Sequence, residues 1–298
     1  MALLTLQHIV KQYGAYVASD DVSFTIPKGK IFGMLGPNGA GKTTLIRMIT
    51  RILYPDSGSI LFNGEALSDV HTEHIGYMPE ERGLYKKMKV GEHLIYLGRL
   101  KGLSKAKAKE NVHYWLNRFG IESWENKTIE ELSKGMSQKI QFIATVLHDP
   151  ELLILDEPFS GLDPINSKLI EDEIHELSNK GKTIIFSTHR MEQVEEICDD
   201  IVLVNKGRII LEGGVKDLKQ RFKENKFRVQ FNGEVTGGFL EKLNIVERGK
   251  GELTVKFEEE HKGNELLRLF VENNVEVHSF NEVLPSINEI FIRQVQLN

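Results

Sequence analysis

The segment GPNGAGKTT, from Gly36 to Thr44, constrains the fold of this chain more than any other stretch of the sequence. An apolar, β-rich run over residues 30–36 precedes it, and a helical pattern over residues 41–53 follows it. The glycines of the segment allow the backbone to curl with its N–H groups pointing inward. A strand, a glycine-rich loop and a helix in this order predict a loop that binds phosphate at the helix N-terminus.

The segment matches the pattern G-x-x-x-x-G-K-[ST], and a chance match in a chain of this length is on the order of one in a hundred. The predicted nucleotide-binding residues are Gly36, Pro37, Asn38, Gly39, Ala40, Gly41, Lys42, Thr43 and Thr44. Lys42 places a point charge on the outer phosphates, and the Thr43 hydroxyl is positioned to bind Mg²⁺. The pattern indicates a nucleoside triphosphate, but small-molecule kinases, GTPases, motors and transport ATPases all have such a loop.

Other apolar runs predict a parallel sheet that is covered on both faces. They span residues 74–80, 151–158 and 182–189, and they are nearly continuous rather than alternating. A helical pattern covers residues 165–181, and residues 200–214 predict a hairpin about Asn205–Gly207. Repetition of strand, loop and helix indicates the α/β fold class.

Two regions depart from this pattern. Residues 90–148 contain helical patterns only, which predicts an inserted α-helical subdomain at about 88–148. From about Gln220 apolar and polar residues alternate, and the order of elements resembles β-α-β-β-α-β with a terminal helix. We therefore predict a first domain over residues 1–217 and a small α+β domain with an antiparallel sheet over residues 226–298.

The segment LLILDEP, from Leu152 to Pro158, places two carboxylates at the end of a buried strand. Asp156 is positioned to hold Mg²⁺, and Glu157 can polarise an attacking water as a catalytic base. The strand over residues 182–189 ends in His189, which we expect at the nucleotide-binding edge of the sheet. By itself a histidine at a strand end is more often structural.

Composition excludes several classes of protein. The formal net charge of -5 gives no reason to expect nucleic acid as the main ligand. Cys198 is the single cysteine, so no internal disulfide is possible and a reducing compartment is expected. The segment MALLTLQHIVKQYG has no charged region followed by an apolar core, so we expect no secretion signal, and no apolar run reaches the length of a membrane span. Any membrane role is expected to act through a partner.

At this point five segments together resemble the ATP-binding subunits of ABC transporters. GPNGAGKTT, LSKGM, LLILDEP, SGLD and STH occur in that family's order and at its approximate spacings, over residues 3–215. The resemblance implies a P-loop NTPase (RecA-like) core with antiparallel β elements. It also implies that ATP and Mg²⁺ are bound, and that two subunits enclose two ATP molecules. Each site would join the phosphate loop of one chain to the LSKGM signature turn of the other.

The resemblance also implies roles for single residues. The signature turn would contact the ATP bound to the partner subunit with Ser133, Lys134, Gly135 and Met136. A helix expected to begin near Ser137 would direct its N-terminal dipole at the γ-phosphate of that ATP. Lys134 and Met136 replace a usual Gly and Gln, and Lys134 either adds positive charge near the second phosphate loop or points to solvent. Tyr13 would stack on adenine, and Asp163 would contact the partner protomer. Glu80, where the family usually has Gln, would reach Mg²⁺ and catalytic water, and His189 would hold the γ-phosphate.

We therefore expect an ATPase that energises an exporter by ATP-driven dimer closure, as a homodimer or a heterodimer with a like subunit. A separate transmembrane permease would be its partner, contacted by the helical subdomain and residues 80–88, at the cytoplasmic face of the membrane. The C-terminal domain resembles the accessory domain of drug-resistance or sodium exporters. The alternatives are a soluble ABC-type ATPase that acts on DNA or ribosomes, a small-molecule kinase, and an interaction protein with degenerate ATP sites. No nucleic acid is expected.

Overall fold

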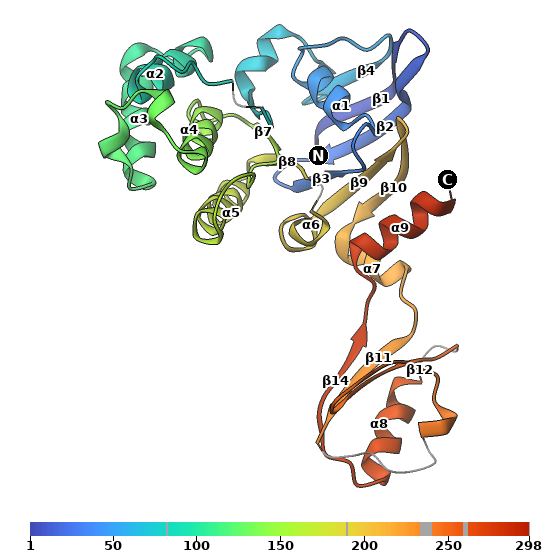
Figure 1. The fold of residues 1–298 in the computed structure, drawn as a ribbon. Helices are drawn as coiled ribbons and strands as arrows, with labels where there is room; N and C mark the ends of the chain where they lie inside the picture. Colours follow the sequence, from blue (N-terminus) through green and yellow to red (C-terminus); the bar gives the residue numbers. More distant parts are fainter. Residues whose placement is uncertain (82, 189, 233–239, 259–261, 298) are drawn as a thin grey trace. The chain divides into compact units, whose positions relative to one another are not determined.

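The computed structural model describes residues 1–81, 83–188, 190–232, 240–258 and 262–297 of the chain. The described part divides into two compact units, Met1–Gly214 and Val215–Leu297. Figure 1 follows the elements of each unit along the chain. Within the described ranges, no helix is both long enough and apolar enough to cross a membrane.

A six-stranded sheet forms the centre of the first unit, in the order β10-β9-β3-β8-β7-β6. Its strands are β3 (Ile31–Leu35), β6 (Ile75–Met78), β7 (Leu152–Asp156), β8 (Thr183–Ser187), β9 (Asp200–Asn205) and β10 (Arg208–Gly214). Neighbouring strands are parallel except β9 and β10, which form the predicted antiparallel hairpin. Every residue of β3, β7 and β8 is buried, as expected for strands covered on both faces.

An antiparallel sheet and the central sheet both pack against helix α1. Its order is β2-β1-β4-β5, with β1 (Ala2–Tyr13), β2 (Tyr16–Pro27), β4 (Ser57–Phe62) and β5 (Glu65–Ala66). Helix α1 (Lys42–Ile49) buries Leu45, Ile46 and Met48 in one core cluster with side chains of both sheets. Burial of this apolar surface fixes the start of α1 against the end of β3.

The predicted helical subdomain consists of three helices, which Figure 1 shows grouped together. They are α2 (Val90–Leu100), α3 (Lys105–Arg118) and α4 (Lys134–Val146), with short 3₁₀ turns at Glu122–Trp124 and Ile129–Glu131. Helix α4 contacts the edge strand β6, which connects the subdomain to the central sheet. The remaining elements of this unit are a 3₁₀ turn at Asp69–His74, α5 (Pro164–Asn179) and α6 (Met191–Ile197).

The second unit is a small α+β domain. Its elements are α7 (Val215–Arg221), β11 (Lys226–Phe231), β12 (Ile245–Gly249), β13 (Glu252–Lys256), α8 (Gly263–Glu272), β14 (Val277–Val283) and α9 (Ile287–Leu297). The four strands form an antiparallel sheet in the order β12-β13-β11-β14. Leu266 and Phe270 of α8 pack on Val229 and Val255 of the sheet. The helix expected between the first two strands falls partly outside the described ranges, and its described part is a 3₁₀ turn at Leu240–Lys242.

Candidate functional site

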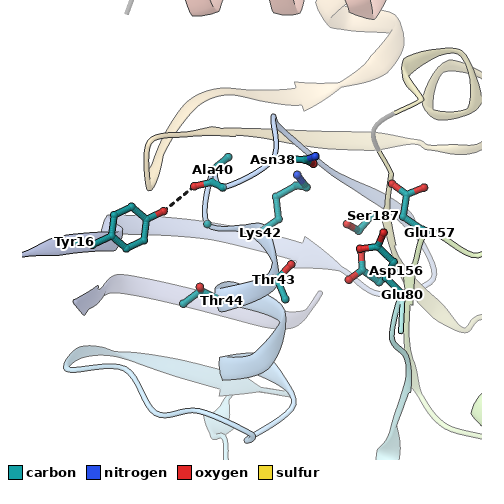
Figure 2. Close-up of a pocket in the computed structure, with 12 residues that line it drawn as sticks. Tyr16, Asn38, Ala40, Lys42, Thr43, Thr44, Glu80, Asp156, Glu157 and Ser187 are labelled. Carbon is teal, nitrogen blue, oxygen red and sulfur yellow. Dashed lines mark hydrogen bonds between the residues drawn. The ribbon is translucent and has the colours of Figure 1, made fainter. Parts of the chain in front are cut away.

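The loops after β3, β6, β7 and β8 meet at one edge of the central sheet. These strands are parallel neighbours, so their carboxyl ends lie together. A cavity of about 590 Å³ opens at this edge, and Figure 2 shows the side chains around it. It is lined by Tyr16, Asn38, Gly39, Ala40, Gly41, Lys42, Thr43, Thr44, Glu80, Asp156, Glu157 and Ser187. The fold thus brings the predicted phosphate loop and the predicted acidic residues to one place.

Glycine at position 41 is required by the approach of another part of the backbone. Gly41 has a φ of 111°, and a Cβ there would lie 2.3 Å from the carbonyl oxygen of Ala18. Helix α1 begins at the next residue, Lys42, and its first residues line the cavity. Gly41 caps this helix without a side-chain hydrogen bond, so the N-terminal N–H groups suit an anion in the cavity.

Among the described residues that line this cavity, Lys42 is the cation. Its Nζ donates to the carbonyl oxygens of Gly36, at 2.7 Å, and Pro37, at 3.0 Å. Burial lowers the pKa of the Lys42 ammonium, and the nearby carboxylates of Asp156 and Glu157 oppose this effect. Figure 2 shows Lys42 beside the loop, with the carboxylates across the cavity.

Three carboxylates converge opposite Lys42. Asp156 ends β7 and is buried, and its burial raises the pKa of its carboxyl. A hydrogen bond from the Ser187 side chain opposes this shift, whereas the charges of Glu80 and Glu157 raise the pKa further. The mutual repulsion of these carboxylates makes the cavity attractive to a cation.

The backbone holds Glu157 in an unusual conformation. Its φ of 51° lies in the left-handed region, which costs a residue with a side chain about 1 kcal/mol or more. Its N–H donates to the carbonyl oxygen of Ser187 at 2.9 Å, and its own carbonyl accepts from the N–H of Ser160 at 3.0 Å. The Thr188 hydroxyl donates to Glu157 Oε2 at 3.2 Å, so both the backbone and the carboxylate are positioned.

The donor set of this cavity fits Mg²⁺. Thr43, Glu80 and Asp156 offer one hydroxyl and two carboxylates, the oxygen ligands that this hard cation prefers. In the described ranges no group of three His, Cys, Asp or Glu is arranged to hold a metal. Mg²⁺ is usually bound through one or two carboxylates together with the phosphates of a substrate.

The signature turn lies at the start of another helix. Helix α4 begins at Lys134, three residues before the start near Ser137 that we predicted. The reason is that Ser133 caps the helix, since its Oγ accepts from the N–H of Met136 at 3.3 Å. Ser133 and Lys134 are exposed, and no residue from 133 to 136 is among the described residues that line the cavity.

The aliphatic part of the Lys134 side chain lies against the SGLD segment, although the residue is exposed. The aliphatic carbons of Lys134 lie over Gly161. A Cβ added to that glycine would lie 2.4 Å from Lys134 Cε. This contact joins the signature turn to the SGLD segment of the same chain. The hydrogen bonds and ion pairs of the described residues include no partner for the Lys134 ammonium.

The other predicted site residues lie outside this cavity or outside the described ranges. Asp163 is exposed and caps α5, where its Oδ1 accepts from the N–H of Asn166 at 3.0 Å. Tyr13 lies across the β1–β2 turn from Tyr16, and its ring is 5.7 Å from the Lys11 ammonium. His189 falls on a position outside the described residues.

Comparisons with known proteins agree with this geometry. A family model described as "ABC transporter" matches residues 19–160, and one described as "ATP-binding protein DrrA1-3-like, C-terminal domain" matches residues 213–295. The ABC transporter ATP-binding protein YhaQ of Bacillus subtilis (strain 168) is 42% identical over 297 residues, which cover 98% of each chain. This chain is an ATP-binding subunit of the ABC transporter family.

Two further comparisons support this membership and the fold. The Nod factor export ATP-binding protein I of Rhizobium sp. (strain N33) is 38% identical over 213 residues, which cover 70% of each chain. A solved structure of an ATP-binding subunit of an ABC transporter is 33% identical, with a TM-score of 0.69. It covers 74% of this chain and 93% of the solved one. The α/β P-loop NTPase core expected from the sequence is therefore confirmed.

Several residues of the site were not predicted from the sequence. Tyr16 lines the cavity and its hydroxyl donates to the carbonyl oxygen of Gly39 at 2.7 Å. Ser187, at the end of β8, forms a hydrogen bond with Asp156. Thr188, in the loop that follows β8, donates to Glu157. The STH segment contains both residues, so neighbouring hydroxyls at a strand end were the available sign. Nothing in the local sequence distinguishes Tyr16 from Tyr13.

Proposed function

We propose that this subunit binds and hydrolyses ATP as a dimer, and that dimer closure drives a separate transmembrane permease. One observation carries the proposal: the phosphate loop lines a cavity, whereas the signature turn is exposed and lies outside the lining of that cavity among the described residues. Ser133 and the start of α4 suit a phosphate. In this proposal they contact the ATP of a second subunit, with Asp163 at the same interface.

The cavity provides the groups that hydrolysis needs. Lys42 stabilises negative charge on the outer phosphates, and Glu157 polarises the attacking water as a general base. Thr188 orients the Glu157 carboxylate for this role. Thr43, Glu80 and Asp156 would hold Mg²⁺, which when bound supplies charge neutralisation at the phosphates. His189 would contact the γ-phosphate, as the family resemblance implies.

We place adenine at the turn between β1 and β2. Tyr13 is the stacking residue that the resemblance implies, and it is exposed. Tyr16 is closer to the phosphate loop, because its hydroxyl binds the Gly39 carbonyl. A base that stacks on either ring would orient its triphosphate toward Lys42.

An apolar groove supports docking of a permease. It has a volume of about 380 Å³ and lies between the sheet and the helical subdomain. Its apolar lining includes Ile52, Leu84, Leu97 and Leu100, and Ile52 and Leu100 are exposed. An exposed apolar groove of this kind fits an amphipathic helix of a partner. In this proposal a cytoplasmic loop of the permease occupies the groove and also contacts residues 80–88.

Export is the direction that we propose. One relative is named for Nod factor export, and the C-terminal unit matches a DrrA-like domain. The subunit would then lie at the cytoplasmic face of the membrane, with its C-terminal unit in a regulatory or subunit contact. The boundaries that we propose for the two domains are residues 1–217 and 226–298. The permease would recognise the transported substrate.

Gel filtration of Glu157→Gln tests the proposal. With ATP and Mg²⁺ we expect this variant to accumulate as a dimer, and to hydrolyse ATP at least about 100-fold more slowly than the wild type. The double variant Glu157→Gln with Ser133→Arg is the control, because a large side chain at the signature turn should prevent the dimer. Wild-type turnover by Glu157→Gln, or dimers of the double variant, would contradict the proposal.

A further inference from the structure

Two buried glutamines of α4 bind the two loops that carry the acidic residues. Gln138 Nε2 donates to the carbonyl oxygens of Pro158, at 2.9 Å, and Glu157, at 3.3 Å. Gln141 Nε2 donates to the carbonyl oxygen of Pro79 at 2.6 Å. Pro79 immediately precedes Glu80, so each amide holds the backbone of an acidic residue or of its neighbour.

These contacts are specific to the loops. Gln138 and Gln141 are three positions apart and therefore share one face of α4. They are 3% and 4% exposed, so neither amide can exchange its partner for bulk water. Gln141 Oε1 has no hydrogen-bond partner in the described part of the chain, so among the described residues the bond to Pro79 alone fixes that amide.

Helix α4 also carries the signature turn at its N-terminus. Ser133 caps this helix, and Gln138 follows only five residues later. The helix is thus connected in its own chain to both acidic loops, while Ser133 and Lys134 at its start are exposed. Through these hydrogen bonds, a displacement of the start of α4 would reach both loops.

We propose that Gln138 and Gln141 are positioning residues that make the signature helix and the two acidic loops move together. When a partner's nucleotide engages Ser133, α4 would set Glu157 and Glu80 for hydrolysis in its own chain. Gln141 and Pro79 also line the apolar groove, so a partner seated there reaches the same hydrogen bond. This inference rests on the proposed function and adds the residues that connect its parts.

A double-mutant cycle tests the role of Gln141. Gln141→Met keeps the length of the side chain and removes the donor. We expect kcat to fall about 10-fold, with KM for ATP changed by less than about 2-fold, because the loop and not the nucleotide is displaced. In a Glu80→Gln background the same substitution should have little further effect, because Gln141 acts through Glu80.

Asn111→Leu is the matched control. Asn111 Nδ2 donates to the carbonyl oxygen of Leu147 at 2.8 Å, so this variant also removes a bond from a side-chain amide to a main-chain carbonyl in the helical subdomain. It leaves the acidic loops untouched, and its kcat should stay within about 2-fold of the wild type. Gln138→Met should lower kcat as Gln141→Met does.

Folding is monitored by thermal unfolding of every variant. If Gln141→Met does not fold, Gln141→Leu replaces it, since it also removes the donor and places no charge at this buried position. Additive losses in the Glu80 cycle, or equal losses in Asn111→Leu, would overturn the inference while the wild type still hydrolyses ATP. A wild type that neither binds nor hydrolyses ATP would instead overturn the proposed function.

Discussion

The phosphate loop and the signature turn are both helix starts, yet they differ in what surrounds them. Helix α1 starts at Lys42, in a cavity that holds three carboxylates and has room for a ligand. Helix α4 starts at Lys134 on an exposed surface, and the Ser133 hydroxyl caps it. The first site is built by its own chain. The second has the chemistry to bind phosphate, but among the described residues nothing encloses it.

The glycines of the two sites show the same difference. Gly41 is required by its own chain, because its φ of 111° and the nearby Ala18 carbonyl exclude a side chain. Gly135 lies in the first turn of α4, and a Cβ there would meet its nearest neighbour, the Gly161 carbonyl oxygen, at 3.5 Å, an ordinary contact. The fold of this chain therefore accepts alanine at position 135. In the proposed dimer, glycine at this position would leave room for the close approach of a partner's nucleotide.

The largest effect is expected from Lys42→Ala. Loss of the only lysine that lines the cavity, among the described residues, should lower ATP turnover at least about 100-fold. Lys107→Ala is the control, because Lys107 is an exposed lysine of α3 paired with Glu110, and its loss should leave turnover within about 2-fold. Steady-state ATPase assays measure both. Undiminished activity of Lys42→Ala would remove the phosphate-loop assignment.

Alanine at each of the two glycines should separate folding from function. We expect Gly41→Ala to lower the free energy of unfolding by about 2 kcal/mol or more, because the chain must move to admit the Cβ. Gly135→Ala should keep this free energy or raise it by up to about 1 kcal/mol, since alanine favours a helix.

Turnover of Gly135→Ala should nevertheless fall about 10-fold, because the methyl group would face the partner's phosphates. Urea denaturation and ATPase assays of the same preparations give both quantities. A stable Gly135→Ala variant with wild-type turnover would break the comparison between the two helix starts.

Ser133→Ala should have smaller effects, one on the free energy of unfolding and one on turnover. Loss of the cap costs about 1 kcal/mol of unfolding free energy. ATP binding to dilute protein should change by less than about 2-fold, whereas turnover at high protein concentration should fall several-fold. The fluorescence of a nucleotide analogue measures binding to dilute protein, and this measurement separates an effect on binding from an effect on turnover. Weaker binding to the dilute protein would mean that Ser133 belongs to the site of its own chain.

The smallest effect at neutral pH concerns His148, just beyond the end of α4. Burial lowers the pKa of His148 to about 4, the charge of Lys101 lowers it too, and the hydrogen bond to Ile75 and the charge of Asp149 oppose this shift. Between the ordinary histidine pKa and this value, the unfolded chain binds more protons than the folded one. Stability from neutral His148 is thus complete above about pH 6.5 and is lost as the pH falls toward 4.

His148→Leu should remove this part of the pH dependence, which amounts to at most about 3 kcal/mol. Urea denaturation of both proteins from pH 7 to pH 4 measures it, and turnover at neutral pH should be unchanged. An identical decline of both proteins with falling pH would exclude His148 as the cause.

Much of the fold could be predicted because it depends on contiguous patterns. The buried strands β3, β7 and β8 are unbroken apolar runs, and the phosphate loop carries its requirements within one short segment. The start of α4 was placed too late, although the preference of serine for the N-cap position was available as a sign.

The contacts of Gln138, Gln141 and Tyr16 could not be predicted in the same way. Each contact is a hydrogen bond from a side chain to a main-chain carbonyl of a loop that lies elsewhere in the sequence. Such bonds depend on how α4 packs against the sheet and on where the β1–β2 turn lies, and local periodicity contains neither. Side-chain amides have no sequence pattern that identifies their acceptors.

The most direct test of the central claim is the specific ATPase activity as a function of protein concentration. If each complete site needs Lys42 of one chain and Ser133 of another, activity per chain should rise with concentration and then saturate as dimers form. Light scattering on the same samples gives the oligomeric state. A constant specific activity over about a 100-fold dilution into monomers would contradict the account, because one chain would then hold a complete site.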